Sequence, residues 1–185
     1  MSKRIAVLAA AASIDLVASA GAQHNKRLVG GAPMLANNNI VQTAVNSKDH
    51  TTLVAAVKAA GLVDTLSGKG PFTVFAPTNA AFAKLPAGTV ETLVKPENKA
   101  TLTKILTCHV VAANAMSTAI NKMIADDKGT HPVKTVGGCV LQAKKNGNMI
   151  TLTDEKGGVA TVTIADVRQS NGVIHVIDTV LLPAS

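Results

Sequence analysis

Two different spacings of apolar residues divide this chain near residue 130 and restrict the folds that it can adopt. Upstream, apolar residues recur three or four positions apart, as on one face of a helix, for example at Leu102, Ile105 and Leu106. One apolar run at 72–76 interrupts these helices and predicts a short strand. Downstream, β-branched or alternating segments predict strands at 133–136, 139–144, 149–153 and 159–165. Helices followed by strands indicate an α+β domain, because a βαβ fold would alternate them regularly.

Two Asn-Gly pairs mark predicted turns in the strand-rich half. Asn146-Gly147 lies between two predicted strands, and Asn171-Gly172 precedes the final apolar run. Asparagine and glycine tolerate the positive φ angles that tight hairpin turns require. The two pairs therefore predict short connections at these positions.

Capping residues mark the predicted helix ends. Asp49 precedes a helix predicted at 50–61 and can accept hydrogen bonds from the free N–H groups of its first turn. Gly61 suits the end of that helix, because glycine readily adopts the left-handed conformation found there. Pro77 ends the central strand, and Thr78 can cap the helix that follows.

The N-terminus has the layout of a secretory signal peptide at 1–22, with a positive pair at 3–4, an apolar stretch and then small residues. An ordinary buried helix is the alternative interpretation. Cleavage would leave a polar, flexible arm at 23–38 and a compact domain at 39–184. We expect a secreted, periplasmic or cell-surface protein with no transmembrane segment in the mature chain.

The composition limits the partners that the chain can bind. Aromatic residues make up 2% of the chain, with three Phe and no Tyr or Trp, so the stacking platforms of single-strand nucleic-acid binders are missing. The formal net charge is +7, but the basic residues are scattered. We therefore expect no nucleic-acid partner. The basic surface supports an alternative function, an envelope protein that binds an anionic glycan or lipid.

The chain has two cysteines, Cys108 and Cys139. In an exported protein an even pair predicts a disulfide, and two buried free thiols are the alternative. A bridge would close a loop of ~30 residues and stabilise the fold by about 3–4 kcal/mol in the chain-entropy estimate.

No group of residues forms a recognisable catalytic or metal-binding motif. Cys108 and His109 are adjacent, so their side chains point in different directions and make a poor nucleophile–base pair. The five histidines lack metal-ligand spacing, and two thiols are too few for a structural zinc site. The acidic pairs at 126–127 and 154–155 are interpreted as solvated loop charges. We expect no enzyme activity and no cofactor.

Three segments together resemble the fasciclin domain. They are 72–82 (FTVFAPTNAAF), 106–111 (LTCHVV) and 170–183 (SNGVIHVIDTVLLP), and their order and separation match the conserved blocks of that family. The resemblance covers residues 39–184. It implies a wedge-shaped β-sandwich of two small sheets flanked by several helices, which agrees with the α+β class.

The resemblance implies structural roles for most residues of the three segments. Two phenylalanines are expected core residues, and the Pro-Thr pair forms the strand-to-helix turn. The histidine of the last segment is expected on the strand face opposite its apolar neighbours. These expected structural residues are Phe75, Pro77, Thr78, Phe82, Asn171, Gly172, His175 and Asp178.

The resemblance also implies non-catalytic adhesion between cells, or between a cell and its host or matrix. The expected partner is a cell-surface or matrix protein or glycan, and we expect a monomer. His109 matches the adhesion-linked histidine of the family, and Asn79 is a second adhesion candidate, with a turn or cap donor as its alternative interpretation. A hydrogen-bonded, partly buried histidine is the alternative interpretation of His109.

The chain departs from the family pattern at two positions. Ala80 stands where an acidic residue is common, and Cys108 stands where the family has tyrosine. The tyrosine-dependent contacts of animal relatives therefore cannot be carried over. The cysteine fits a bridge to Cys139 instead.

Overall fold

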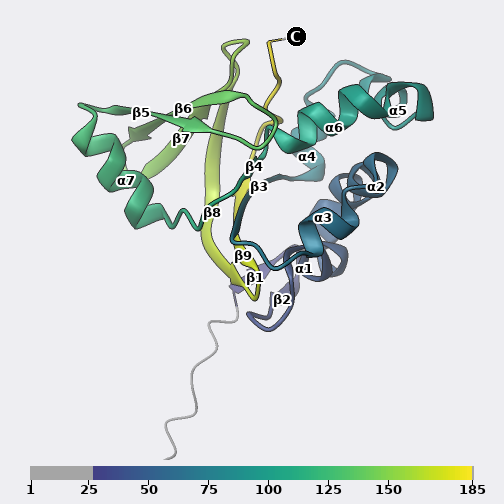
Figure 1. Ribbon diagram of the computed structural model, residues 1–185, viewed down its shortest axis with the longest axis horizontal. Coiled ribbons are helices and arrows are strands. Elements are labelled where there is room, and N and C mark those ends of the chain that lie inside the picture. Colours follow the sequence, from purple (N-terminus) through teal and green to yellow (C-terminus); the bar gives the residue numbers. More distant parts are fainter. Residues whose placement is uncertain (1–26, 185) are drawn as a thin grey trace, which may run out of the picture.

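The computed structural model describes residues 27–184 (Figure 1). The predicted signal peptide at 1–22 and the first residues of the expected arm lie outside the described residues. No helix in the described part of the chain is long and apolar enough to cross a bilayer. The helices are α1 (Ile40–Asn46), α2 (Thr51–Ala60), α3 (Val63–Ser67), α4 (Asn79–Ala83), α5 (Thr89–Leu93), α6 (Lys99–Thr107) and α7 (Ser117–Asp126), with 3-10 helices η1 (Lys48–His50) and η2 (Pro96–Asn98).

Seven strands form one sheet in the order β4-β3-β9-β8-β7-β6-β5. Only β3 and β9 are parallel, and the other neighbours are antiparallel. The strands are β3 (Phe72–Pro77), β4 (Val110–Val111), β5 (Thr130–Lys134), β6 (Val140–Asn146), β7 (Met149–Thr153), β8 (Val159–Gln169) and β9 (Gly172–Ile177). The sheet and the helices together confirm the predicted α+β class.

The long strand β8 divides the sheet into two halves. Its register against β9 shifts between Val162 and Val167, and such bulges bend a strand. One half contains β4, β3 and β9, and the other contains β7, β6 and β5. These halves correspond to the two small sheets expected from the resemblance. Figure 1 shows α7 beside the second half and the other helices on the opposite side of the molecule.

Alternating side chains on the central strands supply two separate cores. Val74 and Ile174 belong to a cluster with the buried faces of α1, α2 and α6. Phe75 and Ile177 belong to a second cluster with α7 and strands β5 to β8. Successive residues of a strand point to opposite faces, so β3 and β9 contribute to both. Burial of each large apolar side chain contributes roughly 1.5–3 kcal/mol.

The expected flexible arm at 23–38 was wrong for the part that the structure describes. Residues 27–38 include an antiparallel hairpin of β1 (Arg27–Val29) and β2 (Ala32–Met34). Val29 and Met34 are only 2% and 4% exposed, because both pack into the helical core. The segment is polar overall, so its composition did not indicate that Val29 and Met34 are buried.

The two predicted turns are present, each displaced by one residue. Asn146 pairs with Met149, so Gly147 and Asn148 make the turn between β6 and β7. Gly147 has φ +59°, the conformation required of the first turn residue in a tight hairpin. Between β8 and β9, Gly172 is already the first strand residue, and the turn precedes it.

Candidate functional site

His109 lies buried between the end of α6, whose C-cap is Cys108, and the C-terminal segment at Leu181. The backbone N–H of Leu181 donates to His109 Nε2 at 2.9 Å. Nε2 is therefore the acceptor, so Nδ1 carries the proton and donates to the carbonyl of Ile105 at 2.8 Å. His109 is 2% exposed, and both ring nitrogens have partners. The hydrogen-bonded histidine of the alternative interpretation is present, and it is more deeply buried than expected.

Burial determines the charge of His109. Desolvation lowers the pKa of His109 to about 4, although the bond to Ile105 and the charge of Asp154 oppose that shift. The ring is therefore neutral at pH 7. A neutral, enclosed imidazole positions backbone groups and, in this conformation, does not contact a partner at the surface.

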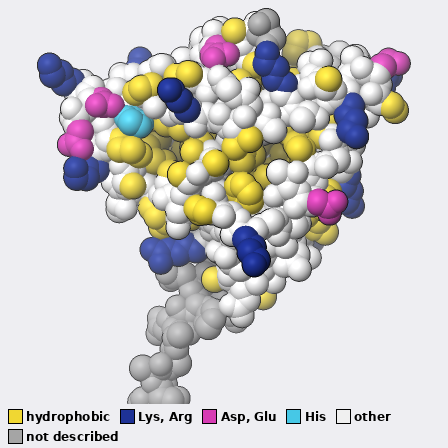
Figure 2. All heavy atoms as spheres, in the orientation of Figure 1, with side chains coloured by type: hydrophobic (Ala, Val, Ile, Leu, Met, Phe, Trp, Pro, Cys, Tyr) yellow, Lys and Arg dark blue, Asp and Glu magenta, His cyan; other side chains and the backbone are white. Residues whose placement is uncertain are grey.

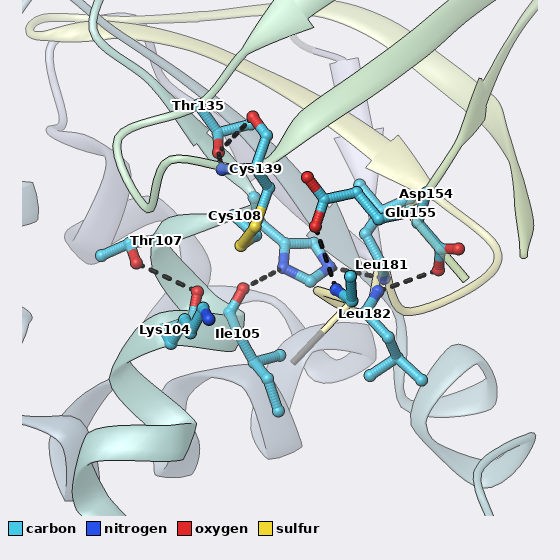
Figure 3. The surroundings of a disulfide bond; sticks show 12 residues. Lys104, Ile105, Thr107, Cys108, Thr135, Cys139, Asp154, Glu155, Leu181 and Leu182 are labelled. Carbon is cyan, nitrogen blue, oxygen red and sulfur yellow. Dashed lines mark hydrogen bonds between the residues drawn. A yellow bond between two sulfur atoms is a disulfide. The ribbon is translucent and has the colours of Figure 1, made fainter. Parts of the chain in front are cut away.

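The predicted disulfide between Cys108 and Cys139 is present (Figure 3), and Cys108 directly precedes His109 in the chain. Its Cα atoms are 5.4 Å apart, within the normal range for a bridge. It connects the end of α6 to the residue before β6, and both cysteines are buried. Thr135 supports this segment, because its hydroxyl donates to Cys139 O and accepts from Cys139 N, each at 3.1 Å.

The acidic pair that follows β7 holds the C-terminal segment. Asp154 Oδ2 accepts from Leu182 N at 2.9 Å, and Glu155 Oε2 accepts from Ala184 N at 2.9 Å. The N–H groups of Ala184 and Val140 lower the pKa of Glu155 below its usual value. Asp154 is 6% exposed, so its interpretation as a solvated loop charge was wrong. Its carboxylate is a structural acceptor.

Asn79, the second adhesion candidate, caps a helix that is distant in sequence. Its Oδ1 accepts from Thr52 N at 3.0 Å and from the Thr51 hydroxyl at 3.2 Å, and its Nδ2 donates to Lys48 O at 2.9 Å. Asp49 makes no side-chain cap bond to α2, whose N-cap residue is His50. The cap predicted for Asp49 was therefore wrong, and Asn79 performs that role from the following strand-to-helix turn.

His175 forms a second buried polar centre on β9. Its ring stacks on Phe75 with centroids 5.6 Å apart, on the face opposite Ile174 and Val176, as predicted. Asp166 N donates to Nδ1 at 3.3 Å, so Nε2 carries the proton and donates to Ala115 O at 2.8 Å. Burial lowers the pKa of His175.

Two further residues, neither of them predicted from the sequence, hold the loop that leads into α7. The Thr73 hydroxyl donates to Ala113 O at 2.6 Å and accepts from Ala115 N at 2.8 Å. The Asp166 carboxylate accepts from both the backbone N–H and the hydroxyl of Ser117, at the start of α7. A threonine within an apolar strand was the only sequence signal for Thr73. Asp166 left none, because its φ of +59° is a property of the folded backbone.

The Asn-Gly pair before β9 connects the sheet to the helices. Asn171 Oδ1 accepts from Ile40 N at 3.0 Å, and Nδ2 donates to the carbonyls of Leu66 and Gly68 at 2.7 and 2.9 Å. A Cβ atom on Gly172 would collide with the carbonyl of Phe72 in the parallel neighbour β3. Glycine is therefore required at that position by close backbone approach.

The remaining motif residues lie around the start of α4 and the end of β9. Thr78 caps α4 by accepting from Ala81 N at 3.2 Å, as predicted, and Pro77 is the last residue of β3. Phe82 is buried in the helical core. Asp178 Oδ1 accepts from Thr161 N at 2.8 Å and so extends the pairing of β8 with the chain after β9.

The chemistry available from these residues is mainly structural. Within residues 27–184, no cluster of three His, Cys, Asp or Glu side chains is arranged to hold a metal ion. Most of the candidate polar side chains bind backbone groups of other elements. These bonds hold separate segments of the backbone in place.

Comparison with known proteins gives the family. The fasciclin domain model matches residues 48–183. Protein sll1483 of Synechocystis sp. is 52% identical over 145 residues, which cover 78% of this chain and 73% of the relative. Cell surface glycolipoprotein MPB83 of Mycobacterium bovis is 34% identical over 177 residues, which cover 91% of this chain and 73% of the relative.

A solved structure agrees in fold. The FAS1 domain pair from the insect cell adhesion molecule fasciclin I superposes with a TM-score of 0.70 at 18% identity. The match covers 80% of this chain and 52% of the solved chain, so this protein spans about half of that pair. With the family match over most of its length, the chain belongs to the fasciclin domain family.

Proposed function

We propose that this protein is an exported, non-catalytic adhesion module that binds a cell-surface or matrix protein or glycan. The observation that carries the proposal is the family match across residues 48–183. A solved member of the same fold comes from a cell adhesion molecule. The polar residues of the motif segments bind backbone groups, which is consistent with a scaffold whose outer surface contacts the partner.

Export and surface location are part of the proposal. The N-terminal segment has the layout of a signal peptide, and the buried disulfide suits an oxidising compartment. A relative that matches 91% of this chain is named a cell surface glycolipoprotein.

His109 and Asn79 act indirectly in this proposal. His109 fixes the C-terminal segment through Leu181 N. Asn79 fixes the start of α2 through Thr52 N. We therefore expect each residue to affect adhesion by holding the backbone group to which it is bonded, without contacting the partner itself.

The test is attachment of beads coated with the full chain to cells of the producing organism and to host or matrix surfaces. We expect saturable attachment that persists as salt is raised through the physiological range, because a specific site does not depend on screened surface charge alone. Attachment that disappears with salt would support instead the binding of an anionic glycan or lipid by the basic surface. Absence of attachment to every surface would contradict adhesion.

Variants separate direct contact from positioning. His109→Ala, checked for folding by circular dichroism, is compared with His131→Ala on the edge strand β5 as the matched control. Under the proposal, His109→Ala weakens attachment only to the extent that it destabilises the C-terminal segment. Hydrogen exchange of the Leu182 amide, which Asp154 holds, reports that destabilisation. Loss of attachment with unchanged exchange at Leu182 would contradict the indirect role.

A further inference from the structure

An apolar hollow of about 40 Å³ opens between the helical layer and the edge of the sheet. Figure 2 shows hydrophobic side chains gathered across the hollowed middle of the face on which Figure 1 places β3, β4 and α3. The helical residues on its wall include Val41, Ala44, Val54, Val57 and Leu106.

The hollow offers almost no hydrogen-bonding groups. His109 lies on its wall, but both ring nitrogens are already bonded, to Ile105 O and to Leu181 N. Lys58 is the only other ionisable residue on the wall. A peptide would bring backbone N–H and C=O groups that need partners when buried. A hydrocarbon chain needs none, so the chemistry favours a hydrocarbon in the enclosed part.

Positive charge lies beside the hollow, at the C-terminal end of α2. Lys58 is exposed in the last turn, and among residues 27–184 the structure gives it no ion-pair partner. The Lys99 ammonium lies 3.3 Å from the position that a Cβ on Gly61 would take. An anionic group at the mouth of the hollow would therefore meet an unpaired cation.

The size of the hollow limits the length of chain that fits. An apolar cavity of about 150 Å³ accepts benzene, so this smaller space holds only the end of a chain. The rest must follow the open part of the hollow toward Lys58. A medium-chain fatty acid fits this arrangement. Its apolar end can occupy the enclosed space, and its carboxylate can lie beside Lys58.

We propose that this hollow is a binding site for a medium-chain fatty acid, with the methyl end against Val57 and Leu106 and the carboxylate beside Lys58. This site gives the protein a second ligand class, a small anionic amphiphile, that adhesion does not require.

The probe is decanoate, added to the full chain with ¹³C-labelled Ala, Leu and Val methyl groups and followed by NMR. We expect saturable shifts at the methyl groups of Ala44, Val54 and Val57, with a Kd below about 1 mM. Decanol, which lacks the charge, is expected to bind about fivefold more weakly, the range of an exposed ion pair. Shifts confined to other regions, or equal binding of acid and alcohol, would overturn the proposal.

Three variants test the assignment. Ala44→Leu and Val54→Phe fill the hollow from half-buried helix positions and should weaken decanoate binding at least ~10-fold, since the enclosed space is lost. Lys58→Gln should weaken decanoate about fivefold and leave decanol unchanged. Lys145→Gln on β6 is the matched control and should change neither. Unchanged decanoate binding in both filled variants would place the ligand elsewhere.

Bead attachment distinguishes this site from the adhesion function. If Ala44→Leu abolishes decanoate binding and retains attachment, the two functions are separate, as proposed. If Ala44→Leu abolishes attachment while decanoate gives no shifts in the wild type, the hollow receives an aliphatic side chain of a protein partner, and the fatty-acid proposal fails. Decanoate binding without any attachment would contradict the adhesion function only.

Discussion

The Nε2 atom of His109 accepts the backbone N–H of Leu181 at 2.9 Å, across 72 positions of sequence. This bond exists only for the neutral ring, because a protonated imidazole has two N–H donors and no acceptor. Protonation would place a positive ring against the N–H of Leu181 inside the core. The contact therefore links the charge of one buried histidine to the docking of the C-terminal segment.

The first prediction concerns acid stability. The pKa of His109 is about 4 in the folded protein and about 6.5 when the chain is unfolded. The unfolded state therefore binds more protons between these values, so the stabilisation is complete above about pH 6.5 and falls as pH decreases toward 4. The loss is on the order of 3 kcal/mol from His109, and burial lowers the pKa of His50 and His175 in the same direction.

Urea unfolding measured from pH 7.5 to 4 checks this prediction. The slope of unfolding free energy against pH should be near zero above about pH 6.5 and positive between about pH 6.5 and 4. A folded His109→Asn variant, which lacks the titrating ring, should show a slope smaller by the contribution of one proton. An identical slope in wild type and variant would show that His109 does not titrate on unfolding.

The second prediction concerns the disulfide. Its sequence separation of 31 residues corresponds to about 3–4 kcal/mol in the chain-entropy estimate. The double variant Cys108→Ala/Cys139→Ala should lose about that much unfolding free energy. Intact mass of the native protein should be two hydrogens below the reduced mass, and native thiol labelling should be absent. Labelling of both cysteines without reductant would contradict the bridge.

The features that could be predicted from the sequence depend on residues close together in the chain. The helical spacing at Leu102, Ile105 and Leu106, the cap at Thr78 and the Asn-Gly hairpin are local patterns, and the structure contains all three. The disulfide was predicted because an even pair of cysteines in an exported chain is expected to form a bridge. The family motif then predicted the arrangement of sheet and helices.

Long-range polar contacts were not predictable in the same way. Asp154 reaches Leu182 across 28 positions, and Thr73 reaches Ala115 across 42. Such bonds leave no periodic signal, because each polar residue is isolated within an apolar or turn-like segment. The amphipathic helix α7 was also missed, although Ile120 and Ile124 have helical spacing and are buried.

The third prediction tests which residue caps α2. Asn79→Ala should destabilise the protein by about 1–2 kcal/mol, because Thr52 N loses its acceptor and Lys48 O loses its donor. Asp49→Ala should cost less than about 0.5 kcal/mol, since Asp49 makes no cap bond to α2. Urea unfolding of the two variants compares them directly. A larger loss of stability for Asp49→Ala than for Asn79→Ala would contradict this prediction and support Asp49 as the cap residue.

The fourth prediction tests whether the N-terminal hairpin belongs to the folded core. Val29→Ala removes buried methyl groups and should cost about 2 kcal/mol. Leu28→Ala, at a neighbouring side chain that is 65% exposed, should cost less than about 0.5 kcal/mol. Thermal unfolding at fixed pH measures both. If both variants lose negligible stability, residues 27–34 do not belong to the folded core and form a flexible arm, as the sequence predicted.

The fifth prediction concerns the loop between β4 and α7. Thr73→Val keeps the shape of the side chain but removes the hydroxyl that binds both Ala113 O and Ala115 N. Because both backbone groups then lack partners in a partly buried site, we expect a loss of about 2–3 kcal/mol. Thr163→Val on β8 is the matched control, since its single bond to Val176 O is longer, at 3.3 Å, and its side chain is exposed.

Hydrogen exchange separates local from global effects of Thr73→Val. If the hydroxyl holds the loop, the amide of Ala115 should exchange faster in the variant, and so should the amide of Ser117, which the Asp166 carboxylate holds. Amides in β6 and β7 belong to the other half of the sheet and should change only through global stability. Uniform acceleration throughout the protein would show that Thr73 contributes to the whole core and not to the docking of α7.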